Sequence, residues 1–167
     1  MTEREAAWGS AQRLEKHGDG FTISTDPSRL NVDVIHGYLA RSYWAENIPR
    51  DVVERSLRNS LCFGVYEGRQ QVGFARVITD LATFAYVADV FVLETHRGLG
   101  LSKWLMQVML GHPDLRYVRR WHLVTRDAQG LYRQFGFAEP ARETSETSNG
   151  AIGFRVRSHR VLPPLGA

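Results

Sequence analysis

The sequence predicts an α/β domain of the α+β kind, with a single mixed, mostly antiparallel central sheet flanked by helices. Apolar residues alternate with a period of two through residues 61–66, 71–78 and 84–92, which indicates three neighbouring strands. A helical period follows over residues 101–109, and a short apolar strand follows at residues 121–125. A strand, a helix and a second strand in this order favour a right-handed crossover and a parallel pair. The end of the sheet should therefore be parallel.

The composition is that of one soluble globular domain. The chain has 167 residues, of which 43% are apolar and 23% are charged. We expect a flexible leader over residues 1–20 and a single domain over residues 21–167. Cys62 stands alone, which excludes an internal disulfide, and no cluster with metal-ligand spacing is present, so no metal is predicted. The net charge is only +3 and the arginines are scattered, which disfavours a nucleic-acid partner.

The chain carries no sign of membrane insertion or secretion. No apolar stretch approaches the roughly 20 residues that a membrane helix needs. The N-terminus mixes acids with bases and lacks the apolar segment of a secretory signal. We therefore expect no membrane partner and a cytoplasmic location.

The first half of the chain reads as a strand followed by two helices. Residues 21–24 alternate and predict the strand. Apolar residues then recur at helical spacing over residues 34–39, with Asn31 or Asp33 as the cap. Proline suits a first helical turn, so a second helix is expected from Pro49 to Ser60.

The second half alternates strands with helices. Residues 67–70 supply a turn between two antiparallel strands, and residues 84–92 are rich in aromatic and β-branched side chains, as a central strand would be. The helix after this strand stops at Gly111. Another helix is expected over residues 128–135, and residues 153–161 alternate as a closing edge strand would.

Two glycines, Gly98 and Gly100, lie where the strand at residues 84–92 leads into an amphipathic helix. The first N–H groups of that helix face the loop, and a phosphate can approach a backbone that carries no Cβ. The helix dipole and Arg97 add positive charge, so the segment predicts a phosphate or pyrophosphate site. The glycines alone also fit an ordinary strand-to-helix turn. Neither a P-loop nor the third glycine of a dinucleotide fingerprint is present.

Two segments resemble one family. Residues 97–102 (RGLGLS) look like the Arg/Gln-x-x-Gly-x-Gly/Ala acetyl-CoA motif of the GCN5-related N-acetyltransferases, the GNAT family. Residues 128–137 (AQGLYRQFGF) are similar to that family's Ala-x-x-Leu-Tyr-x-x-x-Gly-Phe segment. The resemblance covers residues 21–140 and implies the GNAT fold, in which a splayed parallel strand pair forms the acetyl-CoA cleft. It implies transfer of an acetyl group from acetyl-CoA to a primary amine by direct attack in a ternary complex.

The resemblance also implies which residues bind the cosubstrate. The backbone from Arg97 to Ser102 would cradle the CoA pyrophosphate, and the strand edge at residues 90–92 would pair with the pantetheine arm. Thr125 stands where relatives often have an asparagine that helps to hold the pantetheine. The predicted cofactor-binding residues are Val90, Phe91, Val92, Arg97, Gly98, Leu99, Gly100, Leu101, Ser102 and Thr125.

Acyl transfer needs a neutral amine, stabilisation of an oxyanion and a proton for the departing thiolate. Tyr132 matches the family tyrosine near the CoA sulfur and is the candidate acid; a core tyrosine is the alternative. Asp89 is a candidate base or acceptor-binding carboxylate, or else one half of a structural ion pair. Strand alternation places Asp89 on the face opposite Val90. His122 is a weaker candidate base.

The acceptor amine is indicated only by aromatic residues. Tyr43 and Trp44 in the connection between the first two helices, and Phe84 and Tyr86 at the start of the central strand, lie where relatives build the acceptor pocket. Aromatic rings suit a small amine with an apolar or cationic body, but these rings could equally be core packing. A peptide amine stays open as the acceptor. Because relatives are often homodimers, a homodimer is also an expectation.

Fold alone does not decide function, so two rival functions stand beside the N-acetyltransferase. One is a non-catalytic acyl-CoA-binding or regulatory module with the same fold. The other is transfer of a different acyl group, or transfer to an alcohol. Binding without turnover over a broad panel of amines would favour the first rival.

Overall fold

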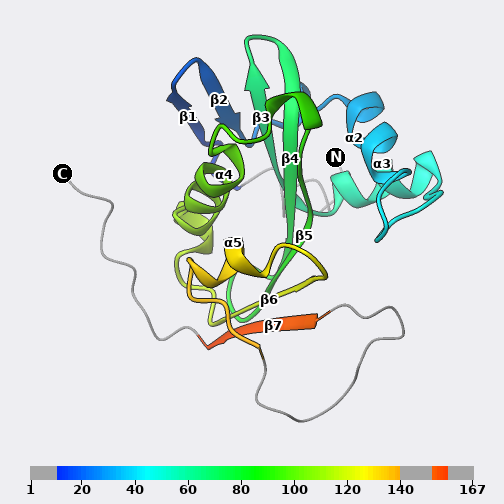
Figure 1. Cartoon of the computed structure of the whole chain (residues 1–167). Helices are drawn as coiled ribbons and strands as arrows, with labels where there is room; N and C mark the ends of the chain where they lie inside the picture. Colours follow the sequence, from blue (N-terminus) through cyan, green and yellow to red (C-terminus); the bar gives the residue numbers. More distant parts are fainter. Residues whose placement is uncertain (1–10, 140–151, 158–167) are drawn as a thin grey trace, which may run out of the picture.

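The computed structural model describes residues 11–139 and 152–157, and its core is one mixed sheet (Figure 1). Along the described chain the seven strands lie side by side in sequence order. The strands are β1 (Glu15–Gly18), β2 (Phe21–Ser24), β3 (Leu61–Glu67), β4 (Gln70–Thr79), β5 (Ala85–Val92), β6 (Arg120–Thr125) and β7 (Ile152–Arg157). The α-helices are α2 (Val32–Leu39), α3 (Arg50–Arg58), α4 (Leu101–Leu110) and α5 (Gln129–Arg133). Single 3-10 turns span Pro27–Arg29, Glu94–His96 and Pro113–Leu115.

The predicted fold class is confirmed. Every neighbouring pair of strands is antiparallel except β5 and β6, which are parallel as the strand–helix–strand order predicts. Helix α4 and the buried Tyr132 of α5 pack on one face of the sheet. Helices α2 and α3 pack on the other face against Phe74 and Phe91 (Figure 1). Each face of the sheet is therefore covered by a different pair of helices.

The helix ends follow from local chemistry. The Asn31 side chain accepts hydrogen bonds from the N–H groups of Asp33 and Val34, so Asn31 is the cap of α2. Pro49 lies just before α3, so the helix begins one residue later than predicted, and it ends at Arg58 rather than at Ser60. Helix α5 ends at Arg133, two residues earlier than predicted, because the chain turns toward Gly136, whose φ is +82°.

The prediction of a flexible leader over residues 1–20 is wrong for residues 15–18. These residues form β1, which pairs with β2 through a two-residue turn at Asp19 and Gly20. Both turn residues have positive φ, 50° and 83°, which suits the right-handed twist of a hairpin. The strand is exposed along its whole length, so it lacks the apolar alternation by which sequence patterns reveal strands. Residues 1–10 lie outside the described residues.

The predicted edge strand over residues 153–161 is confirmed where the structure describes it. Strand β7 pairs antiparallel with β6 over residues 152–157 and is the last strand of the sheet. Residues 158–161 and the polar loop over residues 142–150 lie outside the described residues. Within the described part of the chain, no helix is both long and apolar enough to cross a membrane.

Among the described residues, one buried side-chain polar atom has no hydrogen-bond partner. The hydroxyl of Tyr66 is buried and makes no hydrogen bond to any described residue. Its ring lies close against the backbone of Gly64, where any Cβ would overlap it, and the guanidinium of Arg29 lies 4.3 Å from the ring centroid. A buried hydroxyl without a partner costs about 1–3 kcal/mol.

We expect Tyr66→Phe to stabilise the protein by about 1 kcal/mol, because the substitution removes the unpaired hydroxyl and keeps the ring. Urea-induced unfolding of the two proteins measures the difference in the free energy of unfolding. Tyr117 is highly exposed, so Tyr117→Phe is the matched control and should change nothing. A Tyr66→Phe variant less stable than the parent would contradict the interpretation.

Candidate functional site

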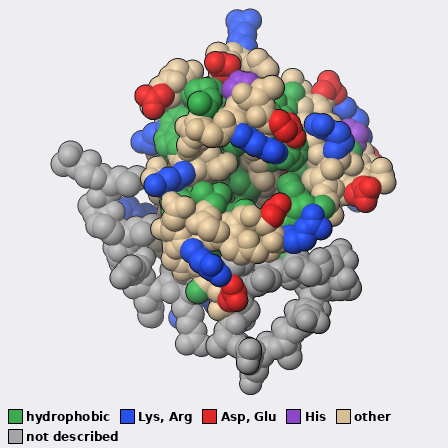
Figure 2. Space-filling view, in the orientation of Figure 1, with side chains coloured by type: hydrophobic (Ala, Val, Ile, Leu, Met, Phe, Trp, Pro, Cys, Tyr) green, Lys and Arg blue, Asp and Glu red, His purple; other side chains and the backbone are tan. Residues whose placement is uncertain are grey.

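The parallel strands β5 and β6 are paired only at their beginnings. The register joins Ala85 to Trp121 and Tyr86 to His122, and no further pair follows. Strand β4 nevertheless pairs with the other edge of β5 as far as Val92. From residue 87 onward, none of the described strands pairs with the edge of β5 that faces β6. The two strands diverge there, as the predicted splay requires, and Figure 2 shows a hollow with apolar side chains near the centre of this face.

The glycine loop lies at the far end of this opening. Gly98 and Gly100 have φ of +79° and +76°, which is the left-handed region that favours glycine. Helix α4 begins after Gly100 with no side-chain cap and no acidic residue in its first turn, so its first N–H groups are available to an anion. A cavity of about 260 Å³ opens here. It is lined by Val92, His96, Arg97, Gly98, Gly100, Leu101, Ser102, Lys103 and Leu131.

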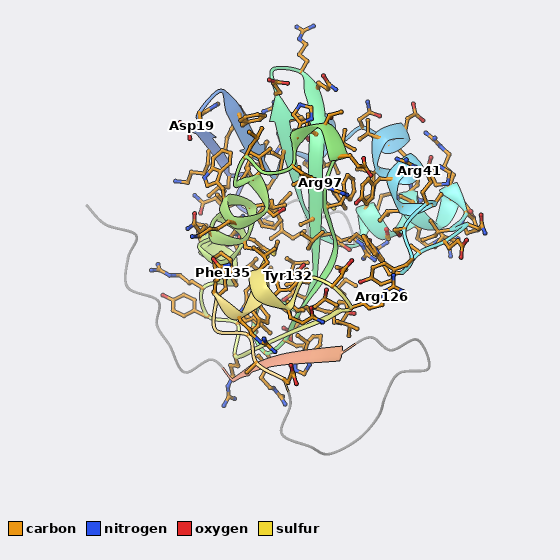
Figure 3. All side chains as sticks on the ribbon, viewed as in Figure 1. Asp19, Arg41, Arg97, Arg126, Tyr132 and Phe135 are labelled. Atoms are coloured by element: carbon orange, nitrogen blue, oxygen red, sulfur yellow. The ribbon has the colours of Figure 1, made fainter. Side chains whose placement is uncertain are left out.

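Most of the predicted loop residues therefore line one cavity. Their burial indicates which of them can contact a ligand only through the backbone. Leu101 is buried in the core, so only its backbone faces the loop, and Leu99 is exposed. The Arg97 Nε donates to the Val92 carbonyl at 3.3 Å, and the same guanidinium donates to the Tyr38 hydroxyl at 2.9 Å. It also lies 3.6 Å from the Glu94 carboxylate. Arg97 thus joins the end of β5 to α2 beside the loop (Figure 3).

The predicted pantetheine edge, residues 90–92, contains two buried side chains. The Phe91 ring stacks on the Tyr38 ring with 3.9 Å between centroids and 7° between planes. Val92 packs in the core on the opposite face. Phe91 would therefore contact a ligand between β5 and β6 through its backbone, whereas Val90 is only partly buried and Val92 also lines the cavity at the glycine loop.

A β-bulge in β5 places Asp89. The register passes from Phe74 opposite Phe91 to Arg76 opposite Ala88, so two residues of β5 face one residue of β4. Asp89 takes up the extra residue with φ of +54°, a conformation that aspartate tolerates better than most side chains. Its side chain lies on the α2–α3 face, the face that strand alternation predicts.

The Asp89 carboxylate already has partners. One oxygen accepts a close hydrogen bond from Arg76 Nε, and the other accepts from Trp44 Nε1 at 3.1 Å. Arg76 also donates to the Ser60 hydroxyl at 3.1 Å. The Arg76 and Asp89 side chains are 16% and 10% exposed, so little water competes with the ion pair. The structure shows the ion pair of Asp89 with Arg76, and a role of Asp89 as a base or acceptor-binding carboxylate stays a prediction.

Tyr132 lies on α5 beside the opening between β5 and β6 (Figure 3). Its side chain is buried, and the residue is 6% exposed. Its hydroxyl makes no hydrogen bond to any residue in the described range 11–139. Burial raises the pKa of Tyr132, and the nearby Tyr43 and Asp127 raise it further. The hydroxyl is therefore protonated at neutral pH and free to donate.

A second cavity, of about 390 Å³, lies between the α2–α3 connection and the loop after β6. It is lined by Tyr38, Arg41, Ser42, Tyr43, Trp44, Glu94 and Asp127. The predicted acceptor residues Tyr43 and Trp44 lie together here. Phe84 and Tyr86 do not line it. The Phe84 ring packs 5.0 Å from the His122 ring, and Tyr86, whose pKa is raised by burial and by Asp89, lies near the Arg76–Asp89 pair.

The loop after β6 holds Tyr43 in place. The Arg126 backbone N–H donates to the Tyr43 hydroxyl at 3.1 Å, and the Arg126 guanidinium lies 3.9 Å from the centre of the Tyr43 ring. Thr125 is buried, and its hydroxyl oxygen accepts from the Ala128 N–H at 3.1 Å. Thr125 therefore caps the turn into α5, and its contact with a cosubstrate stays a prediction.

Sequence patterns missed Arg76, Arg126 and Asp127. Arg76 carries a usable signal, because an arginine among the apolar residues of an inner strand needs a carboxylate partner. Arg126 and Asp127 carry none, because their partner Tyr43 lies more than 80 residues away in the chain. Among the described residues, no group of histidine, cysteine and acidic side chains could hold a metal ion.

Comparison with known proteins places the site in a family. A family profile described as an acetyltransferase (GNAT) domain matches residues 58–139. A protein of Gibberella zeae, named provisionally as an acetyltransferase, is 35% identical over 136 residues. The match covers 67% of this chain and 75% of that protein.

Two solved structures extend the comparison. A Xanthomonas campestris pv. campestris protein, described provisionally as an acetyltransferase of the GNAT family, is 44% identical with a TM-score of 0.72. The match covers 80% of this chain and 99% of that one. A GNAT family acetyltransferase from Elizabethkingia anophelis with acetyl-CoA bound has a TM-score of 0.62 at 11% identity, over 84% of this chain and 100% of that chain. At that identity the likeness shows the fold alone.

Proposed function

This chain belongs to the GNAT family of acetyltransferases, which use acetyl-CoA, and on that premise we propose that it acetylates a primary amine by direct attack in a ternary complex. The observation that carries the proposal is the edge of β5 left unpaired by the described strands, which leads from the open glycine loop toward the Tyr132 hydroxyl, for which residues 11–139 provide no hydrogen-bond partner. In the reaction the acetyl carbon gains a bond to the amine nitrogen and loses its bond to sulfur. One proton passes from the amine to the sulfur.

The residues present fit the cosubstrate. The uncapped N–H groups of α4 and the charges of Arg97 and Lys103 would hold the pyrophosphate. The edge of β5 over residues 87–92 would pair with the pantetheine arm as an added strand does. Acetyl-CoA supplies the activated acetyl thioester.

Two groups of the chain would act on the reacting atoms. A backbone N–H of β5 on its unpaired edge would donate to the developing oxyanion, as a preorganised donor in a dry site does. Tyr132 would donate the proton of its hydroxyl to the departing sulfur, because its raised pKa keeps that proton in place at neutral pH, and would then take up the proton that the amine nitrogen loses.

Asp89 would act as a positioning residue. Its oxygens are engaged by Arg76 and Trp44, so it fixes the bulge and one wall of the second cavity. His122 lies at the paired end of β5 and β6, away from the opening, and is given no role. A homodimer and a cytoplasmic location stay predictions from the sequence.

Calorimetric titration of acetyl-CoA, followed by a thiol-release assay over a panel of small amines, tests the proposal. We expect binding in the micromolar range and thiol release with at least one amine. Binding without turnover over the whole panel would support the non-catalytic acyl-CoA-binding module instead. Absence of binding would contradict both functions.

A further inference from the structure

The second cavity holds a carboxylate that the proposed mechanism does not use. Of its two acidic lining residues, Glu94 lies 3.6 Å from the Arg97 guanidinium. Asp127 has no ion pair with any described residue. Its side chain accepts only from the Tyr43 hydroxyl, across a long 3.4 Å. The Asp127 carboxylate can therefore accept further hydrogen bonds.

Asp127 is placed close to the reacting centre. It follows β6 by two residues, at the end of β6 that diverges from β5. Its charge is felt at the buried Tyr132 hydroxyl, whose pKa it helps to raise. The side chain thus lies within electrostatic range of the candidate proton donor and, at the same time, lines the cavity.

The rest of the lining suits a cation. Tyr38, Tyr43 and Trp44 contribute aromatic rings, and a ring face attracts a positive charge. One face of Tyr38 is covered by the Phe91 ring, and one face of Tyr43 holds the Arg126 guanidinium at 3.9 Å, so a ligand cation would meet the remaining ring surfaces. Arg41 also lines the cavity, but its Nε donates to the Gly37 carbonyl at the end of α2 and its guanidinium lies 5.9 Å from the Tyr38 ring centroid. The positive charge of Arg41 is therefore held at the α2 side, across the cavity from the β6 loop.

We propose that Asp127 binds the ammonium group of the acceptor and so selects a small alkylamine with an aromatic or otherwise apolar body. The proposal rests on the acetyltransferase function, which it deepens by naming the acceptor class. A carboxylate that binds an ammonium raises the local concentration of the amine next to Tyr132. The bound ammonium then releases one proton to solvent, because only the neutral amine has the lone pair that bonds to the acetyl carbon, and Asp127 lies exposed at the cavity wall. An acceptor with its own carboxylate beside the amine would meet repulsion from Asp127 and Glu94. Amino acids should therefore be poor acceptors.

The test compares the parent with Asp127→Asn, using phenethylamine and phenylalanine, which differ by one carboxylate. We expect Asp127→Asn to raise the KM for phenethylamine by about tenfold, because one charge-assisted hydrogen bond is lost. The kcat and the affinity for acetyl-CoA should be nearly unchanged. Phenylalanine should be at least about tenfold poorer in kcat/KM than phenethylamine in the parent, and this gap should narrow in the variant.

Asp51→Asn is the matched control, because Asp51 is an exposed aspartate of α3 outside both cavities. It removes the same charge and should leave both amines unaffected. An unchanged KM in Asp127→Asn, with acetyl-CoA bound and phenethylamine acetylated, would overturn the role of Asp127 alone. Loss of acetyl-CoA affinity in the variant would also overturn it, because Asp127 would then serve the cosubstrate.

A direct binding measurement separates this proposal from the proposed function. Phenethylamine is titrated into the parent and into Asp127→Asn without acetyl-CoA, and tryptophan fluorescence reports on Trp44 in the cavity wall. Binding that the variant loses supports the Asp127 site even if the parent shows no turnover, in which case only the acetyltransferase proposal fails. Equal binding by both proteins, or no binding by the parent, overturns the Asp127 site.

Discussion

Replacing Arg97 by glutamate is expected to weaken acetyl-CoA binding by about 100-fold. The substitution removes a charge-assisted donor worth about 1.5–3 kcal/mol and puts a negative charge beside the open N–H groups of α4, where the pyrophosphate is expected. Calorimetric titration of the parent and the variant measures the change in Kd. The effect should shrink as salt is added, because the Arg97 side chain is about half exposed.

Two further variants test whether the loss of affinity comes from the charge at residue 97. Arg97→Gln keeps a donor, and glutamine occurs at this place in the family motif that the loop resembles, so its affinity should fall by no more than about tenfold. Arg69→Glu makes the same change of charge in the turn between β3 and β4, outside both cavities, and should leave the Kd unaltered. If Arg97→Glu binds acetyl-CoA as the parent does, the pyrophosphate lies elsewhere.

Removing the Tyr132 hydroxyl is expected to lower kcat by about 100-fold, the lower end of what a positioned general acid contributes. The Kd for acetyl-CoA should stay within about twofold, because the phenylalanine ring of Tyr132→Phe retains the packing against Phe137. Steady-state thiol release gives kcat, and calorimetry gives the Kd.

The environment of Tyr132 means that Tyr132→Phe removes the hydroxyl without disturbing other interactions. No described residue hydrogen-bonds to the hydroxyl, so its removal leaves no polar group of the protein unpaired. The fold should therefore keep its thermal stability, which can be checked in the same samples. A kcat equal to that of the parent would remove the acid role and leave Tyr132 as a core tyrosine.

The elements that the sequence predicted well are those whose burial is periodic. Helix α4 shows its apolar stripe at helical spacing, and β3 and β4 show long apolar runs around a short turn. The glycine loop was predictable for a different reason: its function depends on backbone N–H groups, and glycines reveal an exposed backbone. Both signals are local in the chain.

The features that escaped prediction depend on distant segments or on exposed backbone. Strand β1 is exposed along its length and has no apolar pattern. The bulge at Asp89 arises from its register against β4, which no local pattern encodes. Asp127 acquires its place because Tyr43, from the α2–α3 connection, packs against the loop after β6. Phe84 and Tyr86, which are half of the predicted acceptor set, lie outside the second cavity, because the residues that line it are set by packing between distant segments.

The short pairing of β5 with β6 affects the stability of the sheet. Six residue pairs join β6 to β7, whereas only two join β6 to β5. The sheet therefore consists of a five-stranded part, β1 to β5, and a two-stranded part, β6 and β7, with few hydrogen-bonded pairs between them. A ligand strand laid between the two parts would complete the hydrogen-bond ladder that the polypeptide leaves open. Occupancy would then contribute to the folding free energy by mass action, which makes the cosubstrate in effect an eighth strand of the protein.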